Sequence, residues 1–110
     1  MAIVKWQSGA KQDLHEIYDY YCHTKQLPNL AINIRQDIIL AARMLELFPE
    51  QGSREFSLDV ENILFRYLVV RNHYKIIYFH EFDICHIVAI WDCRNNPDIL
   101  PVKIKNKNDH

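Results

Sequence analysis

The longest apolar stretches that are rich in β-branched and aromatic residues lie in the second half of the chain. Three runs, residues 64–70, 74–81 and 84–91, are rich in β-branched and aromatic side chains and are separated by breaks of two or three residues. Each run is too short and too poor in Ala, Glu and Leu to favour a helix. The pattern therefore predicts an antiparallel meander of three strands.

The first turn of this meander sets its register. If Arg71 faces Tyr74 across a two-residue loop, Asn72 takes a positive-φ position of a primed turn, which asparagine tolerates. Directly opposed residues then point to the same side of the sheet. One face is predicted to carry Arg66, Leu68, Val70, Lys75, Ile77 and Phe79. The other is predicted to carry Phe65, Tyr67, Val69, Tyr74, Ile76 and Tyr78, and to lie under the protein's own helices.

Two helical periodicities precede the meander. After a short apolar strand, residues 2–6, Ser8 is expected to cap a helix that ends at about residue 23. Asn29 is expected to cap a second helix that continues to about residue 48. The predicted buried stripes are Ala10, Leu14, Ile17 and Tyr21 in the first helix and Ala31, Ile34, Ile38, Ala41, Leu45 and Phe48 in the second. A short connection between such helices predicts an antiparallel helical hairpin packed on the sheet.

These elements define one fold class and one domain. The polar connection over residues 52–62 contains Phe56 and Leu58 as expected buried anchors. The order is β-α-α-β-β-β, an α+β two-layer domain in which a helical hairpin packs on a small, mostly antiparallel sheet. Because the chain has 110 residues, we expect a single domain over residues 1–100 and a flexible tail over residues 101–110.

Composition excludes several classes of protein. No apolar run approaches the roughly 18 residues of a membrane span, and the first residues lack the core of a signal peptide, so we expect a cytoplasmic protein. A net charge of −1 gives no general attraction to nucleic acid. The cysteines, Cys22, Cys85 and Cys93, have no C-x-x-C spacing and are expected to be free thiols.

Several side chains that could in principle bind a metal or act in catalysis have simpler structural interpretations. His80, Cys85, His86 and Cys93 match no common zinc spacing, so we expect no metal and no cofactor. Tyr78 is expected in the core with its hydroxyl bonded, and His80 at the rim of the sheet.

Several segments follow one another in a recognisable order. They are Trp6 to Tyr18 with Ala10, Asp13, Leu14 and Ile17; Leu45-x-x-Phe48-Pro49-x-x-Gly52; Arg66-Tyr67-Leu68-Val69-Val70; Tyr74-Lys75-Ile76-Ile77-Tyr78; and Ile87-x-x-Ile90-x-Asp92-x-Arg94-x-x-Pro97. Over about residues 3–100 this ordered set resembles the RelE/ParE superfamily of toxins from bacterial type II toxin-antitoxin (plasmid stabilisation) systems. The resemblance implies a growth-inhibitory protein that a cognate antitoxin, encoded beside it, neutralises.

The resemblance leaves two mechanisms open. RelE-like members cleave mRNA on the ribosome with basic residues on the sheet, whereas ParE-like members inhibit DNA gyrase. Arg66, Lys75 and Arg94 match basic positions of the nuclease branch and would be catalytic only in a nuclease. Leu68, however, stands where that branch has a second basic residue.

The end of the sequence favours the second mechanism. Ile99 and Leu100 stand where the nuclease branch has an aromatic acid or base, and the segment from Asp92 to Pro97 is more similar to ParE-like sequences. We therefore expect a ParE-like, gyrase-targeting toxin that acts by binding. A ribosome-dependent mRNA endonuclease is the alternative within the family, and a non-toxic peptide-binding adaptor is the alternative outside it.

The predicted partner surface is the sheet face away from the helices. Its apolar part is a groove of Leu68, Val70, Ile77 and Phe79, flanked by Arg66 and Lys75, with Arg94 beyond the last strand. Such a groove suits an antitoxin helix or strand with acidic residues. The first strand, the tail from Ile99, or a second copy of the chain could instead cover it, so the oligomeric state stays open.

Overall fold

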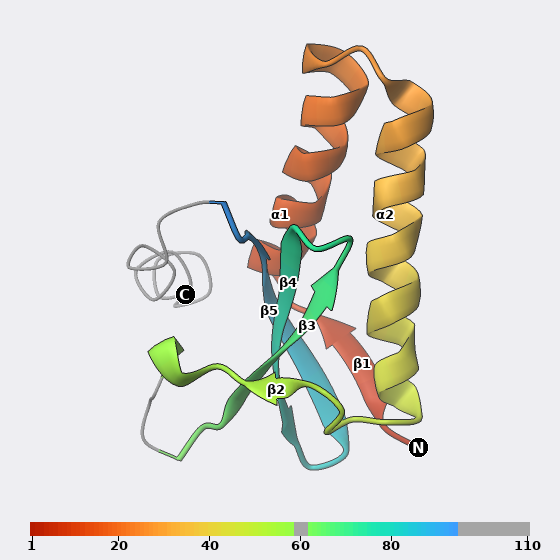
Figure 1. The fold of residues 1–110 in the computed structure, drawn as a ribbon. Helices are drawn as coiled ribbons and strands as arrows, with labels where there is room; N and C mark the ends of the chain where they lie inside the picture. The colour runs from red at the N-terminus through yellow and green to blue at the C-terminus, as the bar shows by residue number, and fades with distance from the viewer. Residues whose placement is uncertain (59–61, 95–110) are drawn as a thin grey trace.

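The protein folds as a helical hairpin packed on one face of a five-stranded sheet (Figure 1). The computed structural model describes residues 1–58 and 62–94, so the predicted tail, Ile99 and Leu100 lie outside the described residues. The helices are α1 (Ser8–Asp19) and α2 (Pro28–Arg43), and the strands are β1 (Ile3–Trp6), β2 (Ser53–Arg54), β3 (Phe65–Val70), β4 (Tyr74–Glu81) and β5 (Ile84–Asp92). The sheet order is β1-β5-β4-β3-β2, with β1 parallel to β5 and the other pairs antiparallel. The predicted α+β fold class is confirmed.

The helices begin slightly before the predicted caps. Gln7, not Ser8, holds the N-cap position of α1, and Pro28 opens α2, where its missing N–H would have had no helical partner. A π-helical turn, η1 (Tyr20–Thr24), extends α1 close to its predicted end. In the part of the chain that the structure describes, no helix is both long and apolar enough to cross a membrane.

The buried stripe of α2 departs from prediction near its end. Ala42 is 1% exposed whereas Ala41 is only partly buried, and Phe48, at 55% exposure, lies outside the core. A short 3₁₀ turn, η2 (Met44–Glu46), ends the regular helix before Phe48. The α-helical period favours steps of three, four, four and three from Ala31, which arrive at Ala42 and Leu45.

The turn between β3 and β4 corrects the predicted register by one residue. Val70, not Arg71, pairs with Tyr74, and the loop has three residues. Arg71 (φ 54°) and Asn72 (φ 58°) adopt the left-handed conformation, whereas His73 does not. A one-residue shift moves every side chain of a strand to the opposite face, and here it inverts the predicted orientation of β3 relative to β4.

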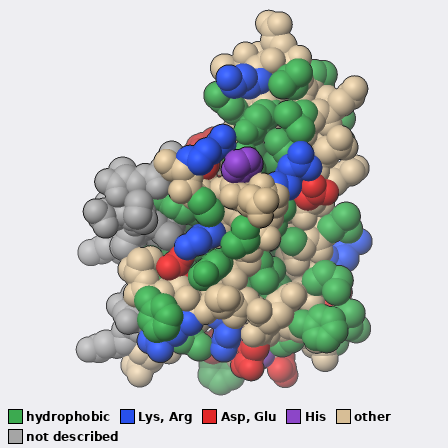
Figure 2. Space-filling view, in the orientation of Figure 1, with side chains coloured by type: hydrophobic (Ala, Val, Ile, Leu, Met, Phe, Trp, Pro, Cys, Tyr) green, Lys and Arg blue, Asp and Glu red, His purple; other side chains and the backbone are tan. Residues whose placement is uncertain are grey.

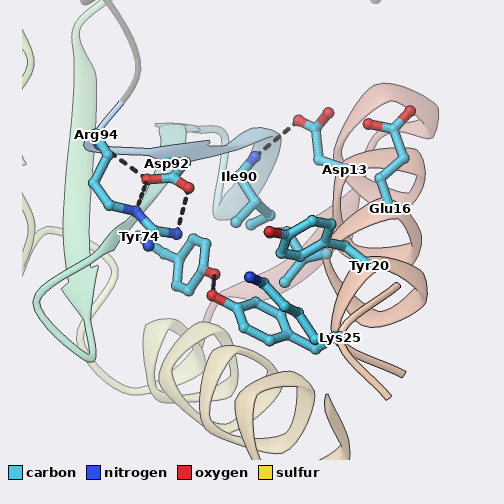
Figure 3. Close-up of a pocket in the computed structure, with 10 residues that line it drawn as sticks. Asp13, Glu16, Tyr20, Lys25, Tyr74, Ile90, Asp92 and Arg94 are labelled. Carbon is cyan, nitrogen blue, oxygen red and sulfur yellow. Dashed lines mark hydrogen bonds and ion pairs between the residues drawn. The ribbon is translucent and has the colours of Figure 1, made fainter. Parts of the chain in front are cut away.

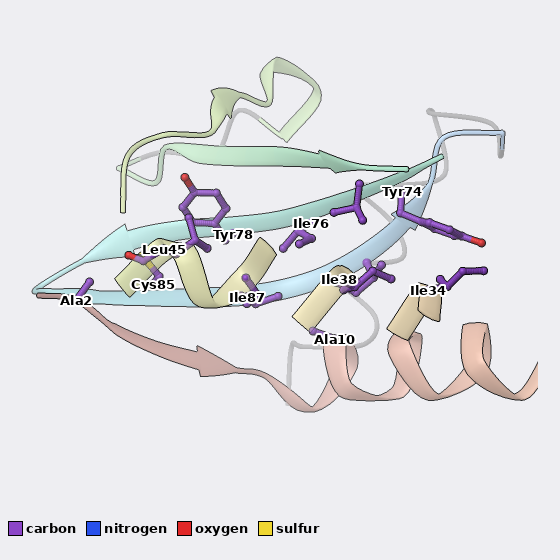
Figure 4. Packing of buried hydrophobic residues seen from close by; sticks show 13 residues of the cluster. Ala2, Ala10, Ile34, Ile38, Leu45, Tyr74, Ile76, Tyr78, Cys85 and Ile87 are labelled. Carbon is purple, nitrogen blue, oxygen red and sulfur yellow. The ribbon is translucent and has the colours of Figure 1, made fainter. Parts of the chain in front are cut away.

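Each face of the sheet carries its own apolar cluster. On the helix side, Tyr74, Ile76 and Tyr78 of β4 pack with Val70 and with α2 (Figure 4). On the far side, Phe65, Ile77 and Trp91 form a second cluster, and Leu58 closes it. The prediction for β4 is therefore confirmed, but that for β3 is wrong, because Arg66, Leu68 and Val70 lie on the helix side and Phe65, Tyr67 and Val69 lie on the far side.

Residues 53–58, which we call the covering segment, first form the edge strand of the sheet and then turn onto part of the far face. They include β2, which pairs with β3, and a 3₁₀ turn, η3 (Phe56–Leu58). Leu58 is 5% exposed, as predicted for an anchor, whereas Phe56 is 68% exposed and its predicted burial is wrong. The ring of Phe56 instead lies under the guanidinium of Arg54, 4.8 Å from ring centroid to Cζ.

Candidate functional site

The cations predicted to share one face do not form one site. Arg66 pairs with Tyr78 across the sheet and lies on the helix side, whereas Lys75 pairs with Val69 and lies on the far side. The expectation of a common face is therefore wrong, for the register reason given above. Figure 2 shows Lys and Arg side chains spread over one face of the molecule with Asp and Glu among them, not gathered into a basic patch.

Arg66 holds the chain at the turn before β2. Its Nη1 donates to the carbonyl oxygen of Gly52 at 2.8 Å and to that of Glu50 at 3.3 Å. A Cβ at Gly52 would lie 2.8 Å from the backbone oxygen of Tyr67, so only glycine lets the two backbones approach. These contacts give Arg66 a structural role.

Lys75 is neutralised beneath the covering segment. Its Nζ lies 2.9 Å from Oε1 of Glu55 and 4.2 Å from the ring centroid of Tyr67. The Glu55 side chain is 9% exposed, and its other oxygen accepts a hydrogen bond from Ser57 Oγ at 3.1 Å. The ammonium therefore faces a carboxylate of its own chain.

The four residues of the predicted apolar groove do not lie on one face of the sheet, so this prediction is also wrong. Leu68 and Val70 pack on the helix side, while Ile77 and Phe79 belong to the far cluster, which Leu58 partly covers. Any partner role of the individual residues stays a prediction.

Arg94 lies at the rim of a cleft of about 510 Å³ that neither Arg66 nor Lys75 lines (Figure 3). Its Nε and Nη2 donate to the two carboxylate oxygens of Asp92 at 2.9 Å and 2.7 Å. These hydrogen bonds lower the pKa of Asp92 and raise that of Arg94. The cleft is lined by Asp13, Glu16, Ile17, Tyr20, Tyr21, Lys25, Tyr74, Ile90, Asp92 and Arg94.

Tyrosines dominate this cleft. The π-helical turn contributes Tyr20 and Tyr21, and the Tyr74 hydroxyl donates to that of Tyr21 at 3.2 Å. Burial, followed by this bond, raises the pKa of Tyr74, whereas the bond from Tyr74, followed by one from Arg94, lowers the pKa of Tyr21. Sequence reasoning missed this group because it placed Tyr21 on a buried helical stripe and assigned no role to Tyr20. No periodic signal predicts that a π-turn would aim both toward β4.

The remaining candidates have structural roles. The Tyr78 hydroxyl is buried and accepts a hydrogen bond from the Gly52 N–H at 2.9 Å, as predicted for a core tyrosine. His80 is partly buried near the end of β4, with Nδ1 3.6 Å from Oε1 of Glu50. Cys22, Cys85 and Cys93 are free thiols, and burial raises the pKa of Cys85 to about 11. Among the described residues no three His, Cys, Asp or Glu side chains form a group that could hold a metal ion.

Comparison with known proteins identifies a family. The family model described as "ParE toxin of type II toxin-antitoxin system, parDE" matches residues 4–97. The fold is similar to a solved chain described as a chromosomal ParDE toxin-antitoxin system from P. aeruginosa, with a TM-score of 0.68 and 25% identity over 84% of this chain and 96% of that chain. No curated protein matches the sequence. Because the family model spans most of the described fold, the chain belongs to the ParE toxin family of type II toxin-antitoxin systems.

Proposed function

We propose that this toxin acts in the cytoplasm by binding a protein target, DNA gyrase, that it does not cut RNA, and that a cognate antitoxin silences it. The observation that supports a binding mechanism is that Arg66 and Lys75 lie on opposite faces of the sheet, and that neither lines the cleft at whose rim Arg94 lies. Metal-independent RNA cleavage needs a base for the 2′-hydroxyl, an acid for the leaving oxygen and cations that converge on one phosphate. The described positions of the three cations do not offer that convergence.

The bonding of each cation adds support. Arg66 donates to backbone carbonyls, Lys75 to Glu55, and Arg94 to Asp92. Each cation would have to leave its partner to stabilise a phosphorane. The three cations are therefore not preorganised for the transition state of RNA cleavage. Gyrase is the target we favour because the sequence ending is ParE-like and the family match is to ParE toxins.

The outer side of α2 offers a surface for the antitoxin. Four apolar side chains, from Leu40 near the end of α2 to Phe48 just beyond η2, are between 45% and 58% exposed. We call these residues, Leu40, Met44, Leu47 and Phe48, the α2 stripe. Figure 2 shows apolar side chains gathered on the α2 side of the molecule. Exposed Arg43 borders the stripe, so an amphipathic antitoxin helix with acidic flanking residues would match it.

Expression in bacteria tests toxicity and neutralisation together. Induction of the chain alone is expected to arrest growth, and co-expression of the short protein encoded beside it is expected to restore growth. Unchanged growth on induction, with the protein soluble and folded, would favour the non-toxic adaptor.

Purified protein tests the target. We expect ATP-dependent supercoiling of relaxed plasmid by gyrase to be inhibited, and the inhibition to vanish when the antitoxin is added in equimolar amount. Topoisomerase I relaxation of the same plasmid serves as the control reaction and is expected to be unaffected. Uninhibited gyrase together with growth arrest would point to the ribosome instead.

A further inference from the structure

Hydrogen-bond donors converge in the cleft between the end of α1 and the ends of β4 and β5. The hydroxyl of Tyr20 and the ammonium of Lys25 point into the space next to Tyr74 (Figure 3). Tyr21 completes the group through its 3.2 Å hydrogen bond with Tyr74. Because Tyr21 accepts the proton of Tyr74, its own proton is available to a ligand in the cleft. The hydrogen bond that Tyr21 receives from Tyr74 polarises its hydroxyl and makes it a stronger donor.

The acidic residues of the cleft do not occupy this convergence point. The carboxylates of Asp13 and Glu16 lie on the α1 side and point away from the tyrosine hydroxyls (Figure 3). Asp13 is 2% exposed and accepts the Ile90 N–H at 3.0 Å. Asp92 is held by both donor nitrogens of Arg94.

We propose that this cleft binds a single carboxylate, the side chain of an Asp or Glu in a protein partner. Lys25, whose Nζ lies 5.8 Å from the ring centroid of Tyr20, supplies the charge, and the hydroxyls of Tyr20 and Tyr21 supply directed donors. The site does not depend on the target proposed above, because it is defined by the side chains of this cleft alone.

The local charge favours a carboxylate over a phosphodiester chain. The cleft contains two cations, Lys25 and Arg94, against three carboxylates. One of the cations is already paired with Asp92. A single acidic side chain that reaches the hydroxyl cluster meets mainly Lys25, whereas a polyanion would also pass the carboxylates on α1 and gain little from counterion release.

The site can be tested by NMR titration of the full chain at constant ionic strength. N-acetylglutamate amide is the probe, N-acetylglutamine amide is its neutral control, and dimethyl phosphate represents a phosphodiester. We expect saturable shifts of the ring signals of Tyr20 and Tyr21 with the glutamate compound, and at least tenfold weaker binding of the glutamine compound, which corresponds to about 1.4 kcal/mol.

Matched variants separate this site from general charge effects. Tyr21→Phe and Lys25→Met are expected to weaken binding of the glutamate compound by about tenfold, as the loss of a charge-assisted bond would. Tyr18→Phe and Lys11→Met, which alter a different cleft on the outer side of the hairpin, are expected to leave binding unchanged. Equal shifts with the glutamine compound, an unchanged affinity in Lys25→Met, or tighter binding of dimethyl phosphate would each overturn the proposal. None of these outcomes bears on growth arrest or on gyrase.

Discussion

Lys75 and Glu55 form an ion pair of 2.9 Å that joins β4 to the covering segment across the far face of the sheet. The pair is poorly solvated, because the Lys75 side chain is 27% exposed and the Glu55 side chain 9%. It explains why a lysine on an apolar strand need not be a catalytic or partner-binding residue. Its main consequence is that Lys75 contributes to folding.

Replacement of Lys75 by alanine is expected to destabilise the protein by about 2 kcal/mol, because it leaves the buried Glu55 carboxylate without its cation. If Lys75 were an ordinary surface lysine, its replacement by alanine would change the free energy of unfolding by less than about 0.5 kcal/mol. Urea denaturation measures the difference.

Two variants control this experiment. Lys11→Ala removes an exposed lysine from α1 and is expected to change stability by less than about 0.5 kcal/mol. The double change Lys75→Met with Glu55→Gln removes both charges and is expected to recover part of the loss. A Lys75→Ala protein as stable as Lys11→Ala would show that the ion pair is energetically neutral.

Tyr78→Phe is expected to lower the free energy of unfolding by about 1 to 2 kcal/mol, because the buried N–H of Gly52 loses its acceptor. It is also expected to leave growth arrest intact, since the hydroxyl is closed in the core and cannot act as a catalytic acid or base. Thermal denaturation and an induction assay give the two readouts. A Tyr78→Phe protein that is as stable as wild type but no longer toxic would contradict the structural role of this hydroxyl.

The Asp92–Arg94 pair predicts an acid-dependent contribution to stability. Hydrogen bonds from Arg94 lower the folded-state pKa of Asp92 below its unfolded value of about 4, so the unfolded chain binds more protons on acidification. The contribution is present above about pH 4 and is lost as pH falls through the lower folded pKa. It is expected to be about 1 kcal/mol or less, because Arg94 is 55% exposed.

Asp92→Asn should therefore be slightly less stable at pH 7 and lose less stability between about pH 5 and pH 2, as urea midpoints across that range would record. Arg94→Gln removes the partner and is expected to weaken the same dependence. Parallel pH profiles for wild type and both variants would show that the pair is not linked to folding.

The α2 stripe predicts a separation of binding from stability. Leu40→Ser with Leu47→Ser is expected to weaken antitoxin binding by at least about 100-fold, because two apolar contacts of roughly 1.5 kcal/mol each are lost. Their exposure above 50% predicts a small effect on unfolding. Isothermal titration with the purified antitoxin measures the affinity, and Gln36→Ser is a matched polar control on α2. Full affinity in the double variant would place the antitoxin elsewhere.

The sequence was sufficient for the fold because long periodic segments determine it. The two faces predicted for residues 74–81 are confirmed by the two separate clusters that their side chains join, and the helical spacing from Ala31 to Ile38 is confirmed by burial. The orientation of β3 could not be predicted as securely. It depends on whether Arg71 belongs to the strand or to the loop, and left-handed conformations at Arg71 and Asn72 decide that question.

The candidate site was less predictable for the same reason. The sequence pattern places Arg66 and Lys75 on adjacent strands, as the structure does, but a loop predicted one residue too short puts them on the same face. The interaction of Glu55 with Lys75 joins residues 20 positions apart, and no periodic pattern links them. The tyrosine cleft depends on a π-turn, which has no reliable sequence signal.

The most direct test of a binding mechanism is to incubate purified toxin with translating ribosomes and to map the 5′ ends of the mRNA at single-nucleotide resolution. An unrelated folded protein of similar size gives the background, and inhibition of gyrase by the same preparation shows that the toxin is active. The account predicts no cleavage above background. Codon-aligned cleavage that disappears in Arg94→Ala would contradict it.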